Sequence, residues 1–88
     1  MARKQYVVVL EAGTNNWSAY VPDVWGCVAT GKTRDEVVAN IRDALEFHFE
    51  GMHEDADPIP SPGTWTAVVE VEVPAGAPDA APRQVEAR

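Results

Sequence analysis

The sequence is short of cysteine, of positive charge and of long apolar runs. Its single cysteine, Cys27, excludes an internal disulfide and a multi-cysteine zinc site, and it suits a reducing compartment. Only 7 Lys and Arg stand against 14 acids, a formal charge of −7 that opposes direct phosphate contact. No apolar stretch approaches the roughly 20 residues of a membrane span. We therefore expect a cytoplasmic protein without a direct nucleic-acid or membrane partner.

The 88 residues are enough for one small domain followed by a tail. Residues 1–74 carry nearly all of the large apolar side chains. Residues 75–88 consist mainly of Ala and Pro, with only Val85 able to anchor a core. Such a composition buries too little apolar surface to offset the entropy of ordering. We expect a flexible tail there, and no DNA-binding domain.

The first third of the chain predicts three antiparallel strands joined by tight turns. Residues 4–11 are rich in β-branched residues with an uninterrupted apolar centre, which is typical of a central strand. Gly and Asn in residues 12–16 favour a reversal into a second strand at residues 17–21. A break at Pro22 and Asp23 then precedes a short third strand at residues 27–30.

An amphipathic helix of about five turns follows the strands. Thr33 and Glu36 match a capping box, in which the Thr hydroxyl and the Glu carboxylate bind amides at the helix start. At 100° per residue the apolar positions gather on one side, and Gly51 lies near the expected end. The predicted core side consists of Val37, Val38, Ile41, Ala44, Leu45, His48, Phe49 and Met52.

Residues 64–73 alternate apolar and other side chains with the period of a strand. A right-handed crossover through the helix would place this fourth strand parallel to the first. The prediction is an α+β domain of β-β-β-α-β order, with sheet order 3-2-1-4 and the helix on one face. The uncovered face and the edge of the fourth strand favour self-association as a dimer or tetramer.

Several short motifs, in order, resemble the HicB family of antitoxins over about residues 5–73. Each motif is weak alone, but five at the expected intervals are a specific signal. Trp25, Lys32 and the pair at residues 15–16 depart from the usual residues without altering the topology. The matching positions are Tyr20, Val21, Pro22, Asp23, Val24, Trp25, Gly26, Cys27, then Gly31, Lys32, Thr33, then Ala44, Leu45, Glu46, and finally Pro58, Ile59, Pro60.

This resemblance implies a partial ribonuclease H-like fold with the strand order given above. It also implies a function, the neutralisation of a small toxin of the HicA type, which is similar to a double-stranded RNA-binding domain and cleaves messenger RNA. Many members of the family add a C-terminal DNA-binding domain. This chain ends instead in an Ala and Pro tail, so autoregulation of transcription is not expected from it alone.

The residues do not predict an enzyme. A ribonuclease H site needs a carboxylate mid-way along the first strand to hold Mg²⁺, whereas that stretch is apolar and its one acid, Glu11, lies at the end. Cys27 is expected to be a small buried residue, and His48 a packed core imidazole. His53 is expected in solvent, and a metal site from His48, His53 and Asp57 is disfavoured. We predict no catalytic residue, metal or cofactor.

Acids and two aromatics are the candidates for partner binding. Between Lys32 and Asp57 there are eight acids against three bases. Such a run is commonly just a solvated helix surface, but it would also complement a basic, RNA-binding toxin. Phe47 projects about 120° from the core side of the helix, and Trp25 stands in a turn, so both are candidate anchors. The predicted partner-binding residues are Trp25, Asp43, Glu46, Phe47 and Glu50.

The predicted function is therefore that of an antitoxin that occludes a small basic HicA-like toxin. A stand-alone oligomeric regulator or scaffold without a toxin remains open as the alternative. A metal-dependent hydrolase is a third class, which would show binding of Mg²⁺ or Mn²⁺. The product of the neighbouring gene separates the first two, because only a toxin–antitoxin pair needs a small basic protein beside it.

Overall fold

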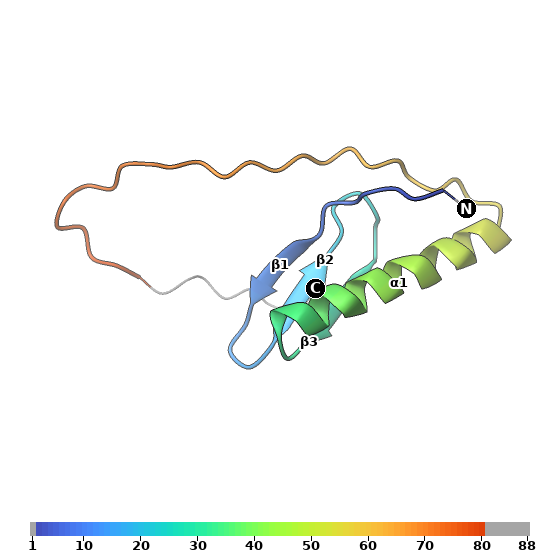
Figure 1. Cartoon of the computed structure of the whole chain (residues 1–88), viewed down its shortest axis with the longest axis horizontal. Coiled ribbons are helices and arrows are strands. Elements are labelled where there is room, and N and C mark those ends of the chain that lie inside the picture. Colours follow the sequence, from blue (N-terminus) through green and yellow to red (C-terminus); the bar gives the residue numbers. More distant parts are fainter. Residues whose placement is uncertain (1, 81–88) are drawn as a thin grey trace.

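A computed structural model describes residues 2–80, and it contains a three-stranded antiparallel sheet with one long helix across a face (Figure 1). The elements are β1 (Val9–Ala12), β2 (Trp17–Tyr20), β3 (Val28–Gly31) and α1 (Arg34–Glu54). The strands lie in the order β1-β2-β3. The α+β class and the predicted meander of three strands are confirmed.

The pairing of β1 is shorter than residues 4–11, and its limit is set by β2. Val9 pairs with Tyr20 and Ala12 with Trp17, so the ladder ends where β2 ends. Beyond Tyr20 the chain turns, with the Val21 amide donating to the Cys27 carbonyl, and Pro22 has no amide to give. Residues before Val9 therefore have no strand partner in β2. β1 is an edge strand of this sheet rather than the predicted central strand.

The helix begins as the capping box predicts, with one difference. The Thr33 hydroxyl accepts from the Glu36 amide at 3.0 Å, which satisfies one of the free amides of the first turn. The Glu36 carboxylate accepts from the Lys32 amide at 3.1 Å rather than from Thr33 itself. The side chain of Asn40 then donates to the Thr30 carbonyl at 2.8 Å and ties the helix to β3.

The core lies between α1 and the sheet. Val37 and Ile41 are 0% and 1% exposed, and they pack against β2 and β3. Each such side chain stabilises the fold by about 1.5–3 kcal/mol relative to exposure. Tyr6 and Phe49 extend the core, with ring centroids 5.3 Å apart. The buried hydrophobic residues are Ala19, Val21, Val24, Cys27, Val37, Ile41 and Leu45.

The helix stops at Glu54, so Gly51 lies near its end as predicted. Its end is a Schellman motif, in which the Asp57 amide donates to the Met52 carbonyl and the Ala56 amide to the His53 carbonyl. Ala56 takes the left-handed conformation there, with φ of 57°. Glycine usually fills this left-handed position, whereas here it is an alanine.

The predicted fourth strand is not formed. Residues 64–73 are extended, but within residues 2–80 they pair with no strand, and they run away from the sheet in Figure 1. The radius of gyration is 16.3 Å, against about 12 Å for a compact chain of this length. Of the predicted sheet order 3-2-1-4, the structure therefore contains only the 3-2-1 part. Residues 64–73 have the alternating pattern of a strand, but this pattern does not determine which strand they pair with.

The tail prediction falls only partly within the described residues. Residues 75–80 are exposed and contain no helix or strand, while residues 81–88 lie outside the described part of the chain.

Gly31 is required where β3 meets the first turn of α1. A Cβ at this position would lie 2.6 Å from the Val37 nitrogen and 2.9 Å from its Cα, both backbone atoms that cannot swing away. We expect Gly31→Ala to lower the free energy of unfolding by about 1–3 kcal/mol in urea denaturation.

The matched control is Gly51→Ala, because Gly51 lies within α1 and a Cβ there meets no atom within 4 Å. It should leave stability unchanged or raise it by up to about 1 kcal/mol. Equal effects of the two substitutions would contradict the close approach at Gly31.

Candidate partner-binding groove

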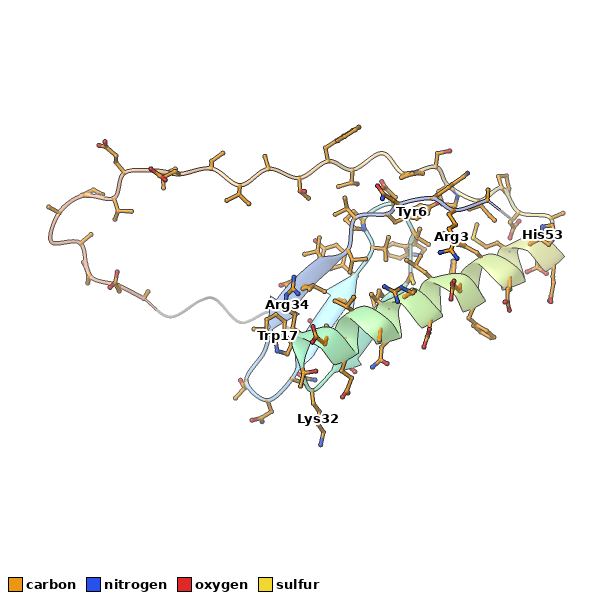
Figure 2. The ribbon with its side chains drawn as sticks, viewed as in Figure 1. Arg3, Tyr6, Trp17, Lys32, Arg34 and His53 are labelled. Carbon is orange, nitrogen blue, oxygen red and sulfur yellow. The ribbon has the colours of Figure 1, made fainter. Side chains whose placement is uncertain are left out.

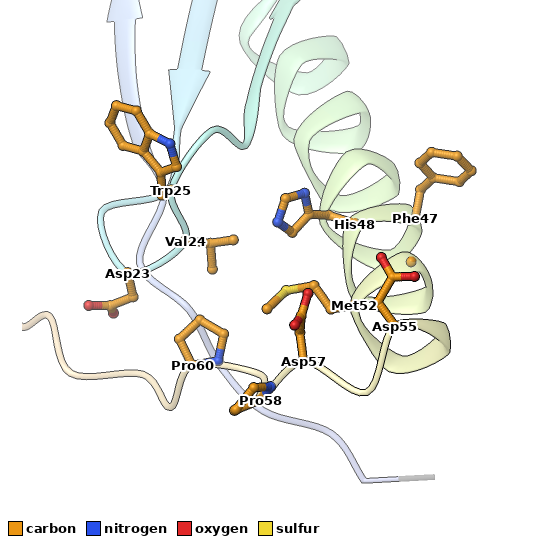
Figure 3. Close-up of a pocket in the computed structure, with 11 residues that line it drawn as sticks. Asp23, Val24, Trp25, Phe47, His48, Met52, Asp55, Asp57, Pro58 and Pro60 are labelled. Carbon is orange, nitrogen blue, oxygen red and sulfur yellow. The ribbon is translucent and has the colours of Figure 1, made fainter.

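An open groove of about 650 Å³ lies at the C-terminal end of α1 (Figure 3). Its walls come from three places: the turn between β2 and β3, the last turns of α1, and the chain after the helix. We call this last stretch, residues 55–63, the return segment. The residues that line it are Asp23, Val24, Trp25, Phe47, His48, Gly51, Met52, Asp55, Asp57, Pro58 and Pro60.

The floor of this groove is mainly apolar. Val24 is 2% exposed, and Figure 3 shows His48 and Met52 of α1 facing it and Pro60 across the groove. His48 is half-buried and meets the Phe49 ring edge-on, with centroids 6.5 Å apart. It is therefore a packed imidazole at the margin of the core, close to its predicted role.

The two aromatic candidates line the same groove, and both are left open to solvent. Trp25 is 95% exposed and Phe47 is 79% exposed. Neither side chain is covered by the sheet or by the chain that follows the helix. Figure 3 shows the two rings turned outward from the turn and from α1. Large exposed aromatics next to an apolar floor are suited to anchoring a partner.

The acidic candidates lie on the helix surface beside the groove rather than in it. Asp43, Glu46 and Glu50 are exposed and do not line it. Together with Phe47 they occupy positions i, i+3, i+4 and i+7, which form one stripe on a helix. We call these four residues the acidic stripe. Phe47 is the member that belongs to both the stripe and the groove.

Sequence reasoning missed part of the groove. Asp55 was counted only as a charge, Asp57 as a charge and a disfavoured metal ligand, and Met52 only as core, although all three line it. The signal was the Pro58 and Pro60 pair directly after the helix, because two prolines end a helix and fix the path of the returning chain. That path closes one wall of the groove.

Asp23 holds the returning chain in place. Its carboxylate accepts from the amides of Gly63 and Thr64 at 2.9 and 3.1 Å and from the Thr64 hydroxyl at 2.8 Å. Figure 3 shows this side chain at the margin of the groove, on the side of the chain that follows Pro60. The hydrogen bonds from the Gly63 amide and the Thr64 side chain lower the pKa of Asp23. We call this contact the Asp23 clamp.

The remaining candidates for catalysis or metal binding are not grouped into a site. Cys27 is buried, and desolvation raises the pKa of its thiol, which disfavours the reactive thiolate. His53 is exposed in the last turn of α1, at the far end of the helix in Figure 2. Within residues 2–80 no three side chains of His, Cys, Asp or Glu are grouped as metal ligands would be.

Comparison with known proteins assigns the chain to a family. A family model described as the HicB-like antitoxin of bacterial toxin–antitoxin systems matches residues 6–76. The chain belongs to this HicB-like antitoxin family. The match covers the sheet, the helix, the return segment and residues 64–73, so the extended segment is part of the family domain. The resemblance read from the motifs is confirmed.

Two curated proteins are similar to the chain in sequence. "Antitoxin HicB 2" of Photorhabdus laumondii is 37% identical over 71 residues, which cover 81% of this chain and 50% of that protein. An "Uncharacterized 14.9 kDa protein in rep-hol intergenic region" of Haemophilus phage HP1 is 38% identical over 55 residues, covering 62% of this chain and 41% of the phage protein. The chain thus spans about half or less of the length of these two relatives. No solved structure gives a significant match.

Within residues 2–80, no helix is both long and apolar enough to cross a membrane.

The Asp23 clamp gives the first prediction for this site. Because its pKa is lowered on folding, the clamp contributes fully above the pKa of an unfolded Asp and is lost as pH falls through the lower folded value. We expect an NMR titration to place the Asp23 carboxyl below the usual Asp range, and Asp23→Asn to speed amide exchange at Gly63 and Thr64.

Asp79→Asn removes the same charge from an exposed position outside the clamp and should leave these amides unchanged. A folded pKa of Asp23 equal to that of an unfolded Asp would show that the clamp does not form in solution.

Proposed function

We propose that the chain is the antitoxin of a type II toxin–antitoxin system, and that it neutralises a small basic HicA-like toxin that cleaves messenger RNA. It acts by occlusion, with the acidic stripe and the groove covering the toxin surface that would hold RNA. The observation that carries this proposal is the exposure of Phe47, 79%, at the point where the stripe and the groove meet. Family membership supports the antitoxin role.

Electrostatic complementarity supports the choice of a basic partner. A protein that binds RNA presents clustered Lys and Arg to the phosphates. Asp43, Glu46 and Glu50 present a surface of the opposite sign on a rigid helix, and the whole chain has a formal charge of −7. Such an arrangement speeds encounter with a basic partner and fixes its orientation.

The apolar contacts supply the affinity. Aromatic residues at the centre of an interface typically contribute more than rim charges, because they fill pockets and lose their water completely. Trp25 and Phe47 are largely exposed and therefore free to enter such pockets. Because these two side chains are not part of the core, they do not contribute to its packing. This is consistent with a role in binding rather than in folding.

A non-enzymatic role fits the placement of the acids. The first strand offers Glu11 only near its end, and Asp35 and Glu36 lie at the helix start. Glu36 is engaged in capping, which explains it without chemistry. We also propose that the protein is cytoplasmic and self-associating. In the assembled protein, residues 64–73 lie beside a β1 strand, which gives the ribonuclease H-like sheet order 3-2-1-4.

Charge reversal on the stripe tests the steering. We expect Glu46→Lys combined with Glu50→Lys to slow association with the basic product of the neighbouring gene by about tenfold at low salt, measured by stopped flow. The difference should shrink at high ionic strength, since salt screens exposed charges.

The control for position is Asp79→Lys compared with Glu46→Lys alone, because both change the net charge equally. Equal rates for these two single variants would reject the stripe as the docking surface. A neighbouring gene without a small basic product would favour the stand-alone regulator instead.

Truncation of Phe47 tests the anchor. Phe47→Ala should weaken the complex by about 1–4 kcal/mol, mostly through faster dissociation, in surface plasmon resonance. It should change the stability of the free chain by no more than about 0.5 kcal/mol, because the ring is exposed.

Phe49→Ala provides the contrast, since that ring packs on Tyr6 and is half-buried. It should lower stability by about 3 kcal/mol. Unchanged toxin binding by Phe47→Ala would remove this residue from the interface.

A further inference from the structure

Residues 64–73 form an extended apolar segment that the single chain leaves uncovered. Trp65 is 93% exposed, and four valines of the segment are 69–101% exposed. Figure 1 shows the segment running clear of the sheet and the helix. The alternation of Trp65, Ala67, Val69 and Val71 is the pattern of a strand with one buried face. We call residues 64–73 the donor segment.

The edge of β1 is the matching acceptor. β1 pairs with β2 on one side and with no other strand among the described residues, so its second edge is open. Helix α1 packs mainly on β2 and β3, which leaves Tyr6, Val8 and Leu10 only partly buried beside that edge. A strand added there would pair the backbone groups and cover these three side chains.

The donor segment is poorly suited to the β1 edge of its own chain. The Asp23 clamp and the hydrogen bond from the Tyr6 hydroxyl to the Pro60 carbonyl hold its root at the N-terminal end of β1. A segment that starts there can run beside its own β1 only in the parallel direction. That direction carries Glu70 and Glu72 toward the Glu11 end of the strand, where like charges oppose pairing.

A second copy has no such constraint, and an antiparallel approach reverses the charges. Glu70 and Glu72 then reach the opposite end of β1, where Arg3 and Lys4 precede the strand; Figure 2 shows Arg3 on this stretch beside Tyr6. Opposite charges on neighbouring strands stabilise their pairing. The segment also has sufficient reach, since its ten residues extend about 33 Å and residues 6–12 span about 23 Å.

We propose that the donor segment of one copy adds as an antiparallel fourth strand to the β1 edge of a second copy, and that the exchange is reciprocal. In the register that the side-chain pattern favours, Trp65, Ala67 and Val69 lie opposite Leu10, Val8 and Tyr6 on the helix-covered face. Val68 lies opposite Val7 on the other face, and Glu72 lies opposite Arg3. The same surface is used by both copies, as a two-fold dimer requires.

This proposal specifies the self-association included in the proposed function, and it does not depend on toxin binding. It is tested on the full chain without any other protein. In a Cys27→Ala background, Val7→Cys and Val68→Cys place two thiols across the proposed pairing. Mild oxidation should give a disulfide-linked dimer on a non-reducing gel, with intact mass showing two bonds between chains.

Two controls define the edge. Val68→Cys alone, and Val68→Cys with Val28→Cys on the β3 edge, should give much less covalent dimer. A covalent monomer from the Val7 and Val68 pair would show that the segment folds onto its own chain and would overturn the proposal. Cross-linking no greater than in the controls would also overturn it.

A second variant keeps the proposal testable if the thiols do not react. Val69 is 75% exposed in the single chain, so Val69→Asp should leave the folded body and its helicity unchanged by circular dichroism. Light scattering should show a dimer for the parent chain and a dissociation constant at least about tenfold higher for the variant. A monomeric parent chain, or a variant that dimerises equally well, would contradict strand donation.

Discussion

The packing of Val37 and Ile41 against the sheet is the contact on which the rest of the molecule depends. These two side chains are the most buried of the core, and they fix α1 across β2 and β3. The helix has 21 residues and a length of about 31 Å, whereas each strand has four residues and spans about 13 Å. The last turns of α1 must therefore extend past the sheet. The groove exists because the β2–β3 turn and the returning chain close around this overhang.

The return of the chain is determined by polar contacts rather than by burial. After the Schellman motif the chain has few apolar contacts, and the clamp on Gly63 and Thr64 and the Tyr6 bond to Pro60 hold it against the body. These contacts also determine where the donor segment departs. A clamp that sits at one end of β1 limits the segment to one direction along its own strand, which is the constraint on which the proposed strand exchange rests.

The parts predicted correctly from the sequence are those with a local cause. The capping box at Thr33 and the turn at residues 12–16 need only neighbouring residues, and both form as expected. The fourth strand needs an edge that lies elsewhere, and its alternating pattern does not say whose edge that is. Exposure of Phe47 followed from its angle on the helix, but the groove beside it did not, because it joins residues more than 20 positions apart. Gly51 and the prolines that follow it marked the region of the helix end, but the left-handed Ala56 that closes the helix carries no glycine signal.

The two association surfaces use different sides of the fold, and this separation matters for function. The acidic stripe lies on the side of α1 that faces away from the sheet, whereas strand addition uses the free edge of β1. A dimer built by strand exchange therefore leaves both stripes open to solvent. Two like-charged copies resist approach through their stripes, whereas in the proposed strand exchange Glu72 would lie opposite Arg3 at the β1 edge. In the proposed arrangement the charge pattern would therefore direct a second copy to the sheet edge and leave the helix open to the basic partner that we propose.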